Sequence, residues 1–237
     1  MRHNADLHAL MQSTCALVMD EADRLLLGDF KTDIDAVLTL VPPSEHRQLV
    51  MLSATFSPEL LALARAKMRP EYKTVDMSEG VVPKRLVQSS LVVEDTARVA
   101  ALKAILDDEL ASNQRARIIC FFNTVAMTQY MTDLFDRVLL QSIIPMHSGL
   151  TMAKRFKNWR TFQRRKRAVM FTSDVSARGM DYDGVSLVVQ FGLASSPDIF
   201  VHRSGRTARA GHDGASLAIL GKSEEAFLAA LDQVCIA

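Results

Sequence analysis

The stretch CALVMDEADRLLLGDF, residues 15–30, decides the fold of this chain. Its five mostly apolar residues, 15–19, run directly into acids at positions 20, 21 and 23. A short, continuously apolar run is typical of a strand in a parallel sheet that is covered on both faces. Ligands of such sheets bind at the carboxyl ends of the strands, so the acids are expected at a ligand site. The structural alternative is that they only cap the next helix.

The same pattern recurs along the chain and predicts an α/β fold built from parallel sheets and flanking helices. Amphipathic stretches such as 96–110 and 124–140 separate the apolar runs, and polar residues follow most of the runs. We expect those polar residues to line a crevice at the carboxyl edge of the sheet. The further apolar runs are LVML (49–52), IICFF (118–122), AVMF (168–171), SLVVQF (186–191) and SLAIL (216–220).

Composition places the chain among soluble globular proteins. It has 237 residues, of which 49% are hydrophobic and 23% charged, enough for one large or two small domains. Its three cysteines show no metal-ligand spacing, which argues against structural zinc and favours a reducing, intracellular compartment. No apolar run approaches the roughly 20 residues that span a bilayer, so no membrane contact is expected. Nucleus or nucleolus, mitochondrion and cytoplasm all stay open.

Charge is distributed unevenly along the chain. Residues 1–83 carry 8 Lys/Arg against 12 Asp/Glu, whereas residues 84–237 carry 20 against 15. The net charges of −4 and +5 make the second part the expected binder of a polyanion. The change of sign falls at VVPKR, around Pro83, and residues 81–86 are predicted to form a linker.

A second motif, HRSGRTARAG at 202–211, complements the acids near the N-terminus. Arg203, Arg206 and Arg209 recur every three residues, and the last two would share one side of the segment if it is helical. Carboxylates suit Mg²⁺ and arginines suit phosphate oxygens. Together the two motifs favour phosphoryl transfer.

Four motifs give this chain a specific resemblance. DEAD at 20–23, SAT at 53–55, SDVSARGMD at 173–181 and HRSGRTAR at 202–209 occur in the order and approximate spacing of the DEAD-box RNA helicases. The chain resembles that family from about Leu17 to its end, and most of all the branch with mitochondrial RNA chaperone and nucleolar ribosome-assembly helicases. The resemblance implies RecA-like parallel sheets: residues 1–80 as the C-terminal part of the ATP-binding first domain, and 87–237 as a complete second domain.

The resemblance also implies nucleotide-site roles, with ATP and Mg²⁺ as cofactors. Asp20 would hold Mg²⁺ through water, and Glu21 would orient and deprotonate the water that attacks the γ-phosphate. Ser53 and Thr55 would couple the nucleotide state to the acidic motif. Arg206 and Arg209 would be arginine fingers, so hydrolysis would need both domains closed on one ATP. Further nucleotide-site contacts would come from Asp23, Asp181, which would touch the ribose, and His202.

The resemblance implies that the partner is RNA, as a single strand or a duplex. The protein is expected to be a monomer. Family members touch the sugar-phosphate backbone, which explains binding without sequence preference. The segment 154–167 has eight basic residues and no acid, and reads as a solvated helix face, an RNA surface or a nuclear import signal. Trp159 within it would stack on a base or be buried in the core. The positions matching family RNA contacts are Asn123, Thr124, Gly149, Arg155 and Ser173.

Several positions depart from the family pattern. Ser173 stands where Thr is usual, MAKR (152–155) replaces QxxR, and Ala208 replaces a commoner Gly. More seriously, the sequence contains no G-x-x-x-x-G-K-[ST] phosphate loop, since GKS at 221–223 has Ser216 in place of the first Gly. The chain is therefore expected to be an N-terminally truncated member whose first 80 residues are unstable alone and which does not hydrolyse ATP by itself.

Three hypotheses about function follow. The first is an ATP-dependent RNA helicase of which this chain is a part, and retention of Asp20, Glu21, Arg206 and Arg209 favours it. The second is a module that binds RNA or a partner protein without hydrolysing ATP. The third is an inactive remnant.

Overall fold

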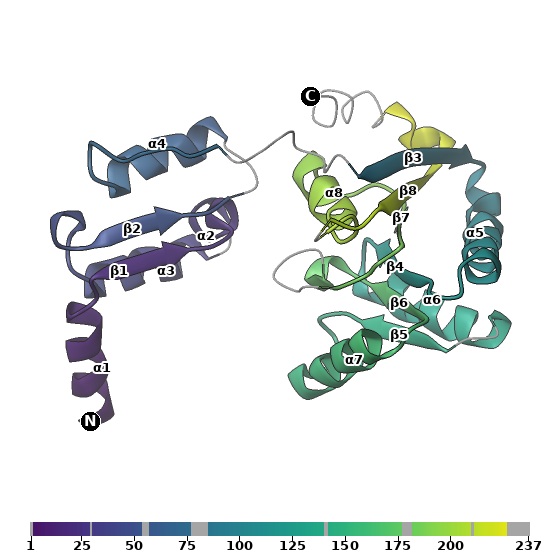
Figure 1. Ribbon diagram of the computed structural model, residues 1–237, viewed down its shortest axis with the longest axis horizontal. Helices are drawn as coiled ribbons and strands as arrows, with labels where there is room; N and C mark the ends of the chain where they lie inside the picture. The colour runs from purple at the N-terminus through teal and green to yellow at the C-terminus, as the bar shows by residue number, and fades with distance from the viewer. Residues whose placement is uncertain are drawn as a thin grey trace. The chain divides into compact units, whose positions relative to one another are not determined.

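The computed structural model describes residues 2–28, 30–53, 57–76, 85–139, 142–176, 182–209 and 211–226. The chain divides into two compact units, residues 1–77 and residues 78–237. In both units the strands are parallel and helices connect them (Figure 1). The predicted α/β class is therefore confirmed.

The first unit is built around a pair of parallel strands. β1 (Ala16–Met19) pairs with β2 (Gln48–Met51) so that the first residues of the two strands, and likewise the last, lie opposite one another. Figure 1 shows α2 at the end toward which both strand arrows point, the carboxyl end of the sheet. The helices of the unit are α1 (Arg2–Gln12), α2 (Ala22–Leu27), α3 (Lys31–Leu40), the 3₁₀ helix η1 (Ser44–His46) and α4 (Pro58–Lys67).

The first unit has a small apolar core. Met19, Ala22, Leu26 and Leu60 are buried together and join the end of β1 to α2 and α4. Val18, by contrast, is 60% exposed. One face of β1 is therefore exposed, because successive side chains of a strand point to opposite faces and only one of these faces packs against α2 and α4.

The second unit contains a six-stranded parallel sheet with the strand order β3-β8-β7-β4-β6-β5. Its strands are β3 (Leu86–Val93), β4 (Arg117–Phe122), β5 (Ile143–Met146), β6 (Ala168–Thr172), β7 (Leu187–Phe191) and β8 (Gly214–Gly221). Its α-helices are α5 (Arg98–Ser112), α6 (Val125–Val138), α7 (Met152–Arg164) and α8 (Pro197–Ser204). The 3₁₀ helices are η2 (Asp95–Ala97), η3 (Asp174–Ser176) and η4 (Lys222–Glu224).

Both faces of this second sheet are buried, as the apolar runs predict. Along β4, Ile118, Cys120 and Phe122 pack with α5 and α6 on one face. Ile119 and Phe121 belong to the cluster on the other face, together with Phe162 of α7. A strand covered on both faces needs apolar residues at every position, which is why IICFF shows no alternation.

The two edge strands were not among the predicted apolar runs. β3 carries a polar stretch, Gln88–Ser90, and begins at Leu86, the last residue of the predicted linker. β5 contains Pro145, which has no N–H for a ladder and is tolerated at the edge of a sheet. Edge strands are exposed along one side, so their sequences are less continuously apolar.

Candidate functional site

The acids of the opening motif lie in a tight turn at the carboxyl end of β1. Glu21 has a left-handed backbone conformation, with φ of 53°, and its N–H donates to Asp20 Oδ1 at 2.9 Å. The N–H of Ala22 donates to the carbonyl of Leu52 at 2.9 Å, which fixes the start of α2 against the end of β2. A non-glycine residue in this conformation costs roughly 1–2 kcal/mol. The surrounding contacts therefore hold a strained turn that presents two carboxylates at the sheet edge.

The second motif meets the first through a side-chain hydrogen bond. Ser53 follows β2, and its hydroxyl donates to Asp23 Oδ1 at 2.9 Å. Both side chains are half-buried, and they are 30 residues apart in the sequence. Because β1 and β2 are parallel and in register, the residues after both strands emerge at the same edge. Thr55 lies outside the described residues.

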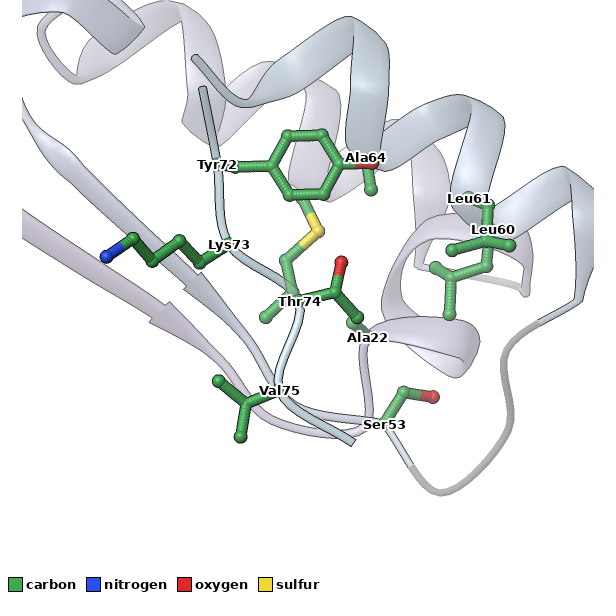
Figure 2. Close-up of a pocket in the computed structure, with 10 residues that line it drawn as sticks. Ala22, Ser53, Leu60, Leu61, Ala64, Tyr72, Lys73, Thr74 and Val75 are labelled. Carbon is green, nitrogen blue, oxygen red and sulfur yellow. The ribbon is translucent and has the colours of Figure 1, made fainter. Parts of the chain in front are cut away.

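A small cavity adjoins this edge (Figure 2). It measures about 80 Å³, and Ala22 and Ser53 form part of its wall. Leu60, Leu61 and Ala64 of α4 and the extended segment 72–75 form the rest, together with Met51. Ligand pockets for small molecules usually have about 300–1,000 Å³. The cavity is therefore too small for a nucleotide.

A larger cavity of about 680 Å³ lies along β2. Residues 47–52 form one part of its wall and residues 68–75 another. Among the described residues that line it, none is Asp20, Glu21 or Asp23. This cavity and the acids therefore belong to different parts of the first unit.

In the second unit, the predicted RNA contacts follow three neighbouring strands. Asn123 and Thr124 come after β4, Gly149 follows β5, and Ser173 follows β6, which lies between those two strands in the sheet. Arg155 is on α7, the helix that follows β5. Parallel strands bring these five residues to one edge of the sheet.

The five positions differ in what their side chains do. Asn123, Thr124 and Gly149 are exposed, whereas Ser173 is buried. Thr124 also caps α6, because its hydroxyl accepts the N–H of Met127 at 3.0 Å. Arg155 is half-buried, and its Nε has no hydrogen-bond partner within the part of the chain that the structure describes.

Arg203 connects several of these positions, a role that the sequence reasoning missed. Its side chain is fully buried, its Nε donates to Asp174 Oδ1 at 2.6 Å, and its Nη2 donates to Asn123 Oδ1 at 3.3 Å. The guanidinium also lies 5.5 Å from the centre of the Phe121 ring. Arg203 therefore ties α8 to the loops after β4 and β6. The three-residue spacing of the arginines gave no signal that the first of them is internal.

The arginine motif is only partly helical, which corrects the sequence expectation. α8 ends at Ser204, so Arg206 and Arg209 lie beyond the helix. Each is attached to the backbone through its Nε, Arg206 to the carbonyl of His202 and Arg209 to the carbonyl of Gly205. Arg206 and His202 are buried, and Arg209 is half-buried.

The end of the motif is held against β8. The Thr207 hydroxyl donates to the carbonyl of Val185, and a Cβ added at Gly214 would lie only 2.0 Å from Thr207 Oγ1. Ala208 adopts a left-handed conformation, with φ of 55°. Gly214 therefore permits the close approach that fixes the positions of Arg206 and Arg209. Asp181, the predicted ribose contact, lies outside the described residues.

Burial changes the proton affinity of two groups near these loops. It raises the pKa of Tyr182 to about 12, although the hydrogen bond between its hydroxyl and Ser176 Oγ opposes the change. Burial also lowers the pKa of His147, and the nearby charge of Lys154 adds to the effect. The lowered pKa favours the neutral imidazole of His147. This ring lies close to Gly149, since a Cβ added at Gly149 would be 3.1 Å from His147 Nδ1.

Metal and membrane features are sparse. The described residues contain no group of three or more His, Cys, Asp and Glu side chains that could hold a metal ion. Mg²⁺ needs no such cage, since it commonly keeps several waters and takes one or two carboxylates. The exposed Asp20 fits that mode.

None of the helices, over the ranges given above, is long and apolar enough to cross a bilayer.

Two protein-family models match the chain. The DEAD/DEAH box helicase model matches residues 2–63, and the helicase conserved C-terminal domain matches residues 98–211. The chain belongs to the DEAD-box helicase family. The predicted resemblance is thus confirmed, and the motifs after β1 and β2 fall within the first match.

Relatives and solved structures agree with this family. The ATP-dependent RNA helicase dbp8 of Aspergillus oryzae is 34% identical over 92% of this chain and 50% of its own length. The mitochondrial ATP-dependent RNA helicase mss116 of the same organism is 33% identical over 90% of this chain and 34% of its own length. The chain therefore spans half or less of the length of these DEAD-box relatives.

The structural comparison confirms the RecA-like fold. Mss116p bound to ssRNA and AMP-PNP matches with a TM-score of 0.83 at 27% identity, over 96% of this chain and 47% of that one. Dbp5 of S. cerevisiae bound to RNA and ADP BeF3 matches with a TM-score of 0.83 at 21% identity, over 98% and 60%. Both of those proteins are bound to RNA and a nucleotide analogue.

Proposed function

We propose that this chain provides the catalytic acids, the arginine fingers and the RNA-binding surface of an ATP-dependent RNA helicase. The observation that carries the proposal is the Ser53–Asp23 hydrogen bond, which joins two motifs of the family at the carboxyl edge of a parallel sheet. The relatives printed as ATP-dependent RNA helicases, and the similar structures bound to RNA and nucleotide analogues, support it.

The first unit provides the acids. Asp20 would hold Mg²⁺ through water, which would neutralise phosphate charge, and Glu21 would take the proton of the water that attacks the γ-phosphate of ATP. Asp23 and Ser53, with Thr55, connect this site to the segment after β2. The strained turn at Glu21 supports the assignment, because such conformations cluster at functional sites.

The second unit provides cations and RNA contacts. Arg206 and Arg209 stabilise charge on the transferring phosphoryl group, and a backbone carbonyl holds the Nε of each, that of His202 for Arg206 and that of Gly205 for Arg209. Asp181 and His202 complete the nucleotide contacts. The RNA contacts are Asn123, Thr124, Gly149, Arg155 and Ser173, which hold the sugar-phosphate backbone and give no sequence preference.

The sequence 1–237 contains no phosphate-binding loop, so we expect the chain alone to bind RNA without hydrolysing ATP. The loop's backbone N–H groups and lysine position the β- and γ-phosphates, and Glu21 needs a positioned substrate. For the isolated chain this is the second hypothesis, a module that binds RNA without hydrolysing ATP. For a protein that also has the loop it is the first, an ATP-dependent RNA helicase.

A gain-of-function chimaera tests the proposal. The phosphate-loop segment of a DEAD-box relative is fused in front of the chain, and phosphate release is measured with and without RNA. We expect RNA-stimulated hydrolysis in the chimaera, reduced about 100-fold or more by Glu21→Gln, because a positioned general base contributes about 10²–10⁴ in rate. Arg209→Gln should reduce the rate by about 10³ or more.

Two results would contradict the proposal. One is a folded chimaera that binds ATP and RNA yet hydrolyses nothing. The other is hydrolysis that Glu21→Gln leaves unchanged. RNA-stimulated hydrolysis by the chain without the added loop would overturn only the expectation about the isolated chain.

A further inference from the structure

An exposed apolar stripe runs along α7, where a solvated helix should be polar. Met152 and Phe156 are 71% and 56% exposed, and Arg160 is exposed one turn further on. The spacing of four residues places all three on one face of the helix. Phe156 is more exposed than Trp159, the other aromatic residue of this helix face.

Phe156 is held in a defined orientation by two neighbours. Its ring lies 5.6 Å from the Trp159 ring, centre to centre, at an angle of 29° between the planes. The Arg160 guanidinium lies 5.6 Å from the centre of the Phe156 ring. Trp159 in turn is half-buried and packs against the apolar cluster that contains Phe162. A ring fixed in this way loses little freedom when a flat ligand stacks on it.

The positive charge around Phe156 favours binding of a polyanion. Segment 154–167 has eight Lys or Arg residues and no acid. Proteins that bind single-stranded nucleic acids without sequence preference use exposed aromatic rings within a positively charged surface. Any base can stack on such a ring, since every base has a flat face. Paired bases in a duplex are already stacked on their neighbours, so the platform suits unpaired ones.

We propose that Phe156, supported by Trp159 and Arg160, is a stacking platform for an unpaired base of single-stranded RNA. The inference rests on the proposed function, because Arg155, on the same helix, is one of the RNA-backbone contacts proposed above. It adds a contact to a base face, which those backbone contacts do not provide. The part of the basic segment beside Phe156 is thereby assigned to RNA.

The test compares an RNA of twelve uridines with the same backbone carrying abasic sites. Affinities of the full 237-residue chain are measured by fluorescence anisotropy. We expect removal of the bases to weaken binding about tenfold for the wild-type chain. Phe156→Ala and Phe156→Leu should bind the uridine RNA about tenfold more weakly and show almost no difference between the two RNAs. Their salt dependence should be unchanged, since neither removes a charge.

Tyr130→Ala is the matched control. Tyr130 is 63% exposed on α6, which packs on the other face of the sheet, so its removal should leave both affinities within twofold. Unchanged melting temperatures of the Phe156 variants exclude misfolding. Binding of the uridine RNA by Phe156→Ala within twofold of wild type would overturn the platform and leave the proposed backbone contacts intact. A wild-type chain that binds neither RNA would overturn the platform and the proposed RNA function together.

Discussion

Ala208 has a backbone conformation that is unfavourable for a residue with a Cβ atom. Its φ of 55° lies in the left-handed region, where a Cβ meets the following carbonyl. The turn is nevertheless kept, because Thr207 and Gly214 fix its two sides. The sequence did not show that Ala208 adopts a strained conformation, since its backbone angle depends on contacts with β8.

Ala208→Gly should therefore stabilise the chain by roughly 0.5–1 kcal/mol, after the added freedom of glycine in the unfolded state is subtracted. The melting temperature should rise by about 2 °C. Ala104→Gly is the opposite control, because Ala104 is exposed inside α5 and the same change there should cost about 1 kcal/mol. A lower melting temperature for Ala208→Gly would show that the turn is not strained.

At the scale of helices and strands, the sequence predicted best where both faces are buried. β4, β6 and β7 contain predicted apolar runs, although β7 includes Gln190, whereas the edge strands β3 and β5 were not predicted, because an exposed edge permits Ser and Pro. The arginine spacing allowed a helix through Arg209, but α8 ends at Ser204, because spacing alone does not reveal where a turn begins. The internal position of Arg203 depends on α8 packing near the loops after β4 and β6, which no local pattern encodes.

The contact between α3 and α4 has a predicted pH dependence. Hydrogen bonds from Lys31 and Lys67 lower the pKa of Asp35 to about 2. A carboxylate with a depressed pKa stabilises the fold above its ordinary pKa near 4, and this contribution is lost as the pH falls from about 4 to 2. Asp35→Asn should therefore lower the urea midpoint at pH 6 and approach the wild type near pH 2.

Far-UV circular dichroism at several pH values measures those midpoints. A difference between Asp35→Asn and wild type that stays constant from pH 6 to pH 2 would contradict the ionic origin of the contact. Asp33→Asn is the control on the same helix, and it should lower the urea midpoint at pH 6 less than Asp35→Asn does.

At the scale of the whole chain, the two units differ in how much core they build. The second has a six-stranded sheet buried on both faces, and the first has two strands and a small cluster around Met19. Two-stranded sheets are marginal unless helices cover them. The charge reversal and Pro83 predict a linker at residues 81–86, but the sequence does not show which residues of β1 stay exposed.

Limited proteolysis should therefore reduce the chain to a resistant core of residues 84–237. Cleavage in the first unit is expected first, since its apolar cluster contributes less stability. Mass spectrometry of the products identifies the core. A full-length chain that resists protease as long as the core does would contradict the difference in stability.

On the proposed function, the second unit binds the RNA backbone without reading sequence. This is tested by measuring the affinity of the wild-type chain and Arg155→Ala for oligouridine and oligoadenine from 50 to 300 mM salt. We expect affinities within about fivefold for the two RNAs, a steep fall of affinity with salt, and a log–log slope smaller by about 0.7 for Arg155→Ala. No binding at 50 mM salt, or a preference above tenfold for one sequence, would contradict it.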